Sequence, residues 1–271
     1  MSLGSSNIQA KHLQHLRDKP IDGQVLKELV LAGLTWLRTN QALVNSLNVF
    51  PVPDGDTGTN MTLTMQSAWN EIAELGTRNV GEMAAAVAKG ALMGARGNSG
   101  VILSQLWRGF SRGLHGVETL DGPTLVKGFV EARDTAYKGV VRPVEGTILT
   151  VSKDIASAAE SALTEILERV VPAADVSVQN TPELLPVLKQ AGVVDSGGKG
   201  LFFIFEGMLR YFNGEPLDVP TVNVQPMSAM NLQDAMESVE EGQDYEVVVD
   251  FFPEGTFDLQ TFYGKLETMG T

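Results

Sequence analysis

The sequence contains no cysteine and only three histidines among its 271 residues. The missing thiols exclude disulfides, thiolate nucleophiles and cysteine-ligated zinc. His12 and His15 precede the first firm helical pattern, and His115 lies in an expected turn. A zinc site or a Ser–His–Asp triad is therefore disfavoured.

Basic residues are also scarce: 20 lysines and arginines stand against 33 acidic residues, a net charge of −13. Non-specific nucleic-acid binding, which depends on a basic surface, is therefore not expected. The charge does not exclude ATP, because a metal ion and local backbone dipoles can offset it. No apolar run is long enough to span a bilayer, and no secretory signal opens the chain. We therefore expect a cytoplasmic protein.

Apolar residues recur at helical spacing in eight segments, without a convincing strand among them. The expected helices cover approximately residues 22–47, 59–75, 79–93, 101–112, 123–141, 147–171, 181–191 and 201–212. Residues 172–180 are expected to form a loop. This pattern predicts an all-α fold, an antiparallel up-and-down bundle. The last helix is apolar on most faces, so we expect it to be central or covered by a second subunit in a homodimer.

The composition divides the chain into four parts. Residues 1–21 are interpreted as an N-terminal extension or tag remnant, and residues 22–213 as the helical domain. Residues 214–243, rich in Pro, Asn, Gln, Met and acids, are interpreted as a linker. One expected strand and one helix follow in residues 244–271, too little to bury a core. They predict the start of a second, truncated α/β domain.

A proline- and glycine-rich stretch carries the strongest motif. Residues 48–61 read Asn-Val-Phe-Pro-Val-Pro-Asp-Gly-Asp-Thr-Gly-Thr-Asn-Met. Two carboxylates, Asp54 and Asp56, lie on a turn that opens a helix. Oxygen ligands suit Mg²⁺, and a helix N-terminus offers N–H groups and a positive dipole end to an anion. The alternative is that both aspartates only cap the helix and satisfy the turn.

Three further polar loops precede expected helices. They contain Asn98 and Ser99 between glycines, Glu145 and Thr147, and Asp195 and Ser196. In an up-and-down bundle alternate helix starts share one end, so these loops and the aspartate turn are expected on one rim. Such a rim suits a metal–polyphosphate site, although each loop alone is also explained by helix capping.

Two other motifs are rejected. Lys199 follows a glycine-rich turn, but the spacing of a P-loop fails and no strand precedes it. Asp54 to Gly58 begins like an EF-hand, but Thr59 and Met65 occupy the positions that need Gly and Glu.

Residues 48–61 and the Gly-Ala-Arg-Gly-Asn-Ser-Gly of residues 94–100 resemble the nucleotide-binding L domain of dihydroxyacetone kinases. More closely, they resemble the N-terminal domain of the fatty acid kinase ATP-binding subunit, a Dak2-domain fusion. The resemblance covers about residues 20–212, and residues 244–271 resemble the start of that subunit's middle domain. It implies an eight-helix antiparallel barrel with ATP and two Mg²⁺ ions on its rim.

The resemblance also implies roles for individual residues. Asp54 and Asp56 match the metal-binding, catalytic pair. The related kinases have a further aspartate upstream, where this chain has Val49 beside Asn48, so Asn48 is the substitute metal ligand or the metal shell differs. Thr57 stands where dihydroxyacetone kinases have histidine, as in the fatty acid kinase branch. The expected nucleotide and phosphate contacts are Thr57, Gly58, Thr59, Asn60, Met61, Asn98, Ser99, Gly100, Thr147 and Asp195.

The implied activity is transfer of the γ-phosphoryl group of ATP to the carboxylate of a fatty acid, a reaction of lipid metabolism. A separate, DegV-like fatty-acid-binding protein would present that acyl chain. Alternatives on the same rim are a dihydroxyacetone (glycerone) kinase, a metal-dependent phosphohydrolase, and a non-catalytic nucleotide-sensing adaptor.

Overall fold

The computed structural model describes residues 21–160 and 166–219, together with residues 261, 262 and 265. The predictions for the N-terminal extension, for most of the linker and for the start of a second domain concern residues outside these ranges. The described residues are almost entirely those of the helical part.

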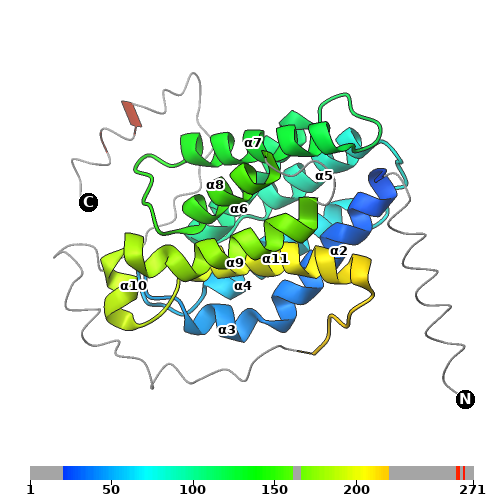
Figure 1. The fold of residues 1–271 in the computed structure, drawn as a ribbon. Coiled ribbons are helices and arrows are strands. Elements are labelled where there is room, and N and C mark those ends of the chain that lie inside the picture. Colours follow the sequence, from blue (N-terminus) through cyan, green and yellow to red (C-terminus); the bar gives the residue numbers. More distant parts are fainter. Residues whose placement is uncertain (1–20, 161–165, 220–260, 263–264, 266–271) are drawn as a thin grey trace, which may run out of the picture.

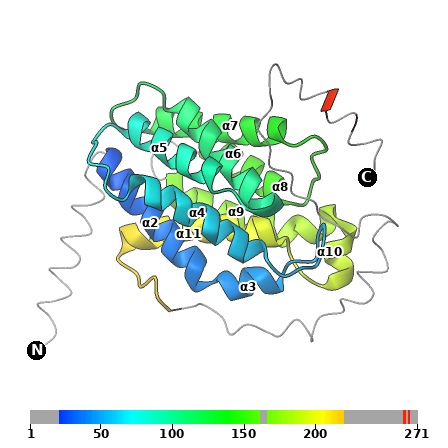
Figure 2. The ribbon, with the colours of Figure 1, turned by 180° about the vertical axis from the view of Figure 1, so that it is seen from behind.

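Eight long helices form a closed ring in the described part of the chain (Figures 1 and 2). Each packs against the next, and the last packs against the first, so the predicted all-α fold is confirmed. Two short helices, α3 and α10, extend the ring at one end. The ring helices are α2 (Gly23–Thr39), α4 (Thr57–Ile72), α5 (Val80–Met93), α6 (Gly97–Gly113), α7 (Gly122–Gly139), α8 (Ile148–Glu160), α9 (Ile166–Leu184) and α11 (Ser196–Asn213); the short ones are α3 (Gln41–Ser46) and α10 (Pro186–Ala191).

The inside of the ring is the hydrophobic core. Every ring helix contributes a buried apolar face, and burying one such large side chain stabilises the fold by about 1.5–3 kcal/mol. Trp36 of α2 meets Phe203 of α11 edge to face, with ring centroids 6.4 Å apart, where the ring closes. An apolar cavity of about 90 Å³ remains among α2, α6, α7, α8, α9 and α11; its lining includes Leu29, Leu103, Trp107, Phe129, Ile155 and Phe205.

The predicted helix at residues 22–47 is divided at Asn40. The Asn40 side chain donates a hydrogen bond to the carbonyl of Trp36 at 2.9 Å, an alternative to continuing the helix. The chain therefore passes from α2 into the separate helix α3.

The helices expected at residues 147–171 and 181–191 are wrong in their bounds. Helices α8 and α9 pack side by side, and Ser177 of α9 donates to the carboxylate of Asp154 on α8 at 2.6 Å. One continuous helix cannot fold back on itself in this way. Residues 172–180, expected as a loop, are helical within α9, and α10 begins only at Pro186.

One end of the ring is closed by backbone hydrogen bonds between segments distant in sequence. The N–H of Gly23 donates to the carbonyl of Arg78, and the N–H of Leu120 donates to the carbonyl of Ile21, both at 2.8 Å. The start of α2 is thereby fixed to the α4–α5 and α6–α7 connections. The opposite end, the rim, carries the starts of α4, α6, α8 and α11.

Candidate functional site

The first pair of helix starts on the rim belongs to α4 and α11. The hydroxyl of Ser196 donates to the hydroxyl of Thr57 at 3.2 Å, although the two residues are 139 positions apart. Both hydroxyls are buried. The predicted aspartate turn and the loop before α11 therefore meet.

The starts of α6 and α8 join them. A Cβ atom on Gly97 would lie 2.4 Å from the Asn60 amide nitrogen, so α6 begins directly against the first turn of α4. A Cβ atom on Gly197 would lie 3.3 Å from the hydroxyl oxygen of Ser99 and 3.2 Å from Cβ of Ile148. The four polar loops predicted to share one end do so.

The two carboxylates of the aspartate turn influence each other. Asp54 is exposed and Asp56 is half-buried, on either side of Gly55, whose φ of +69° favours glycine. Partial burial, followed by the charge and hydrogen bonding of Asp56, raises the pKa of Asp54. A cation between such neighbouring carboxylates relieves their repulsion. The pair therefore has the chemistry of a divalent-cation site.

The side chain of Asn48 fixes this turn through hydrogen bonds. Its side-chain oxygen accepts hydrogen bonds from the backbone N–H groups of Asp56 and Thr57, each at 3.2 Å, and from the Thr57 hydroxyl at 2.8 Å. Its amide nitrogen donates to the carbonyl of Val52 at 2.9 Å. The side chain is buried, and its oxygen is occupied by three donors of the protein. In this arrangement Asn48 shapes the turn that presents the carboxylates.

The surroundings of Val49 give a physical reason why this chain has no acid at the upstream position. It is buried in a small apolar cluster with Leu188, Ala191 and Val193, formed by α10 and the loop after it. In both views α10 lies at the end of the molecule toward which α3 runs (Figures 1 and 2). A carboxylate at this position would be buried without a partner, which is unfavourable.

The backbone N–H groups at the four helix starts differ in their partners. At α4, the N–H groups of Asp56, Thr57 and Thr59 already donate to asparagine side chains. At α6, the N-cap residue Arg96 makes no side-chain capping bond. Within the described part of the chain, the first three N–H groups of α6, those of Gly97, Asn98 and Ser99, have no hydrogen-bond partner. The start of α6 is therefore the most open anion-binding position on the rim.

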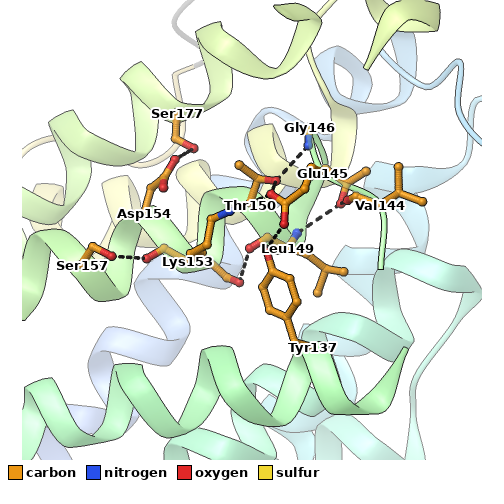
Figure 3. A network of polar contacts seen from close by, with 12 residues as sticks. Tyr137, Val144, Glu145, Gly146, Leu149, Thr150, Lys153, Asp154, Ser157 and Ser177 are labelled. Carbon is orange, nitrogen blue, oxygen red and sulfur yellow. Dashed lines mark hydrogen bonds and ion pairs between the residues drawn. The ribbon is translucent and has the colours of Figure 1, made fainter. Parts of the chain in front are cut away.

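The turn before α8 is held by a polar network (Figure 3). The Glu145 carboxylate accepts hydrogen bonds from Lys153 at 2.7 Å, from Thr150 at 2.6 Å and from Tyr137 at 3.1 Å. Partial burial alone would raise the pKa of Glu145, but these three bonds lower it. The Thr147 hydroxyl donates to the carbonyl of Val144 at 2.7 Å. The predicted contact Thr147 is thus engaged within its own turn.

Asp195 is buried at the junction of three helices. Its carboxylate accepts the backbone N–H groups of Gly198 in α11, at 2.7 Å, and of Ile148 in α8. Its own N–H donates to the hydroxyl of Thr181 in α9 at 2.9 Å. Burial raises the pKa of Asp195 to about 7, although the two N–H groups oppose this. Asp195 therefore joins the starts of two helices.

Met61 and Gly100, which are also predicted contacts, are buried between helices. The Met61 side chain is fully buried, and a Cβ atom on Gly200 would lie 2.5 Å from its sulfur. Gly100 is buried against Thr64, and its N–H donates to the carbonyl of Arg96, the N-cap residue of α6. Their structural role is helix packing. Thr57 and Gly58 are also buried, at the start of α4. The remaining predicted contacts at the starts of α4 and α6 are partly or fully exposed: Thr59, Asn60, Asn98 and Ser99.

Three supporting residues of the rim were not predicted from the sequence. Gln41 and Asn45 of α3 both donate to the Thr59 hydroxyl, at 3.1 and 3.0 Å. The third is Thr64, whose hydroxyl accepts the N–H of Arg96 at 3.2 Å. None of them belongs to a motif, and α3 and α4 carry several other polar side chains, so no signal in the sequence distinguishes these three.

Among the residues that the structure describes, no three His, Cys, Asp or Glu side chains form a group ready to hold a metal. A magnesium site would thus take its remaining ligands from a bound molecule and water, as Mg²⁺ commonly does. The described helices include none that is both long and apolar enough to cross a membrane.

The structure resembles solved kinases in its fold. A crystal structure of the dihydroxyacetone kinase from C. freundii in complex with AMP-PNP and Mg²⁺ matches with a TM-score of 0.55 at 17% identity. The match covers 71% of this chain and 35% of that one. The native form of the same enzyme matches with a TM-score of 0.52 at 18% identity.

Two bacterial proteins are similar in sequence. Protein YloV of Bacillus subtilis is 45% identical over 272 residues, which cover 92% of this chain and 49% of that protein. An uncharacterized protein of Staphylococcus saprophyticus is 43% identical over 263 residues, which cover 92% of this chain and 48% of the relative. The chain thus spans about half the length of these relatives. Residues 51–210 match the DAK2 domain. The chain therefore belongs to the DAK2 domain family.

Proposed function

We propose that the rim binds ATP with Mg²⁺ and that the chain is the nucleotide-binding part of a kinase. The observation that carries this proposal is the open start of α6 beside the aspartate turn. The C. freundii enzyme of similar fold, described in complex with AMP-PNP and Mg²⁺, supports the choice of ligand. We propose two magnesium ions, as the resemblance to dihydroxyacetone kinases implies.

The donor groups on the rim suit a metal-bound polyphosphate. Asp54 and Asp56 would hold magnesium, which would neutralise phosphate charge and orient the terminal phosphoryl group. The N–H groups of Gly97, Asn98 and Ser99 would hold phosphate oxygens. Phosphoryl transfer relies mainly on positioning and charge stabilisation, so no covalent nucleophile from the chain is needed.

The proposed acceptor is the carboxylate of a fatty acid presented by a DegV-like binding protein. The long match of residues 48–61 and 94–100 to the fatty acid kinase branch supports this choice, as does Thr57 in place of histidine. A cytoplasmic location follows from the proposed substrates.

Isothermal titration calorimetry with ATP and Mg²⁺ tests the binding proposal. We expect saturable binding by the wild type and its loss in the double variant Asp54→Asn, Asp56→Asn. The matched control is Glu71→Gln, Glu74→Gln, which removes the same charge at the other end of α4. The proposal is wrong if the wild type binds no nucleotide, or if both double variants bind equally.

A trapping assay tests the acceptor. The protein is incubated with ATP, Mg²⁺ and a fatty-acid-loaded DegV-like protein, and hydroxylamine converts any acyl phosphate to a hydroxamate. We expect hydroxamate that depends on all components. Phosphorylation of dihydroxyacetone instead, phosphate release without any acceptor, or binding without turnover would contradict this acceptor and indicate a glycerone kinase, a phosphohydrolase or a nucleotide sensor.

A further inference from the structure

Two amide side chains of the short helix α3 form hydrogen bonds with Thr59, in the first turn of α4. The Asn45 oxygen accepts the backbone N–H of Thr59 at 3.0 Å, and the Asn45 nitrogen donates to the Thr59 hydroxyl oxygen at 3.0 Å. The Gln41 nitrogen donates to the same hydroxyl oxygen at 3.1 Å. The backbone N–H can only donate, so it fixes which end of the Asn45 amide faces the hydroxyl.

These contacts restrict what the Thr59 hydroxyl can do. A hydroxyl has two acceptor positions and one hydrogen to donate. The two amides fill both acceptor positions. Within the described part of the chain, the Thr59 hydroxyl donates to no protein group. It is therefore prepared to donate to an acceptor, and its lone pairs are not free to ligate a cation.

Gly58 makes this arrangement possible. A Cβ atom on Gly58 would lie 2.5 Å from the carbonyl oxygen of Gln41 and 2.9 Å from the side-chain oxygen of Asn45. Any larger residue would push α3 away from the start of α4. The break at Asn40 separates α3 from α2 and lets the short helix lie against this turn.

We propose that Gln41 and Asn45 are positioning residues, which hold the Thr59 hydroxyl as a hydrogen-bond donor to a phosphate oxygen of the bound nucleotide. The proposal rests on the proposed function, because it needs a phosphate on the rim. It separates two tasks there: the aspartate turn binds the cation, and Thr59 binds the anion. Gln41 and Asn45 act only through Thr59.

The first test compares nucleotide affinities by titration calorimetry. Thr59→Val removes the hydroxyl at nearly constant shape and is expected to weaken binding of ATP with Mg²⁺ about tenfold, the effect of one hydrogen bond to a charged group. Thr59→Ser keeps the hydroxyl and is expected to restore most of the affinity. Thermal unfolding of each variant shows whether the fold is retained.

The second test examines the link between α3 and the hydroxyl. Gln41→Met removes one donor without adding charge and is expected to weaken ATP binding several-fold. Combined with Thr59→Val, it is expected to have no further effect, since two residues that act through one contact are not additive. A purely structural role of Gln41 predicts the same loss of affinity in both backgrounds.

The outcomes separate this proposal from the one it rests on. If the wild type does not bind ATP with Mg²⁺, both proposals are overturned. If the wild type binds, the aspartate double variant does not, and Thr59→Val binds like the wild type, only the inference about Thr59 is overturned. Equal weakening by Gln41→Met with and without the Thr59 hydroxyl also overturns it.

Discussion

Asp195 is expected to make stability fall as pH rises between about 4 and about 7. Its pKa is about 7 in the folded protein, against 3.8 for an ordinary aspartate, because its carboxyl is buried. Between these values the folded state keeps a proton that the unfolded state has lost. Stability then decreases with rising pH, since the folded state binds more protons. Above about pH 7 both states are ionised and this contribution is constant.

The size of the effect follows from that difference in pKa. The slope in this window is up to about 1.4 kcal/mol per pH unit, or about 4 kcal/mol across it. Asp195→Asn cannot ionise, so the variant escapes this loss. The substitution itself lowers the free energy of unfolding by about 1–3 kcal/mol, because the amide N–H₂ group then faces one of the two backbone N–H donors. This cost does not depend on pH. The free energy of unfolding of the variant is therefore expected to increase relative to that of the wild type as pH rises from 4 to 7.

Urea unfolding followed by circular dichroism at pH values from 4.5 to 8 measures the difference in unfolding free energy. The control is Thr181→Val, which removes the acceptor of the Asp195 N–H and leaves the carboxyl in place. It is expected to lower stability by about 1–2 kcal/mol at every pH. A difference in unfolding free energy between Asp195→Asn and wild type that stays constant from pH 4.5 to 8 would refute the reasoning, as would one that changes only above pH 7.

Two further predictions concern packing and the aspartate turn. Gly109→Ala would place a Cβ atom 2.2 Å from the carbonyl oxygen of Glu131, so α6 and α7 must separate. We expect a loss of about 1–3 kcal/mol in urea unfolding, whereas Gly76→Ala, with open space around it, should change stability by less than about 0.5 kcal/mol. Asn48→Ala leaves three donors of the turn without their acceptor. We expect about 1–3 kcal/mol of lost stability together with weaker binding of ATP and Mg²⁺, and Asn48→Asp, which keeps the acceptor, should lose less. Equal effects of Gly109→Ala and Gly76→Ala, or of the two Asn48 variants, would contradict these assignments.

The all-α class and the shared rim were predictable because they depend on periodicity and on the alternation of helix direction. Asp22, Asn79 and Asp195 accept hydrogen bonds from N–H groups in the first turns of their helices, as capping residues do. These are local rules, and they hold without knowledge of the neighbouring helices.

Helix α9 shows where local rules fail. Pro172 lies inside this helix, where proline is unfavourable by about 3 kcal/mol, and the loop expected at residues 172–180 is not found. The helix nevertheless buries residues on one face throughout its length; these include Val170, Ala174, Ser177, Val178 and Thr181. Packing of this face against α8 and α11 outweighs the proline, and that contribution depends on residues far away in sequence.

The supporting residues of the rim could not be predicted for a related reason. Gln41 and Asn45 are uncharged amides that precede the aspartate pair, and nothing in their spacing distinguishes them from surface residues. Their roles arise because α3 packs against the first turn of α4, which Gly58 permits. The motif identified the aspartate turn, and the structure was needed to find the side chains of α3 that hold the adjacent first turn of α4.

The end opposite the rim carries backbone–backbone hydrogen bonds between segments distant in sequence, in addition to side-chain caps such as Asp22 and Asn79. At the end opposite the rim, backbone N–H groups such as those of Gly23 and Leu120 are paired with backbone carbonyls. At the rim, the carboxylate of Asp195 and the amides of Asn45 and Asn48 fix the turns. Side chains join the helix starts there without consuming the first N–H groups of α6. An end closed by backbone pairing has few donors left for a ligand, whereas one fixed by side chains can be both rigid and open. The open N–H groups of α6 and the charges of the aspartate turn both favour the rim as the location of the proposed site.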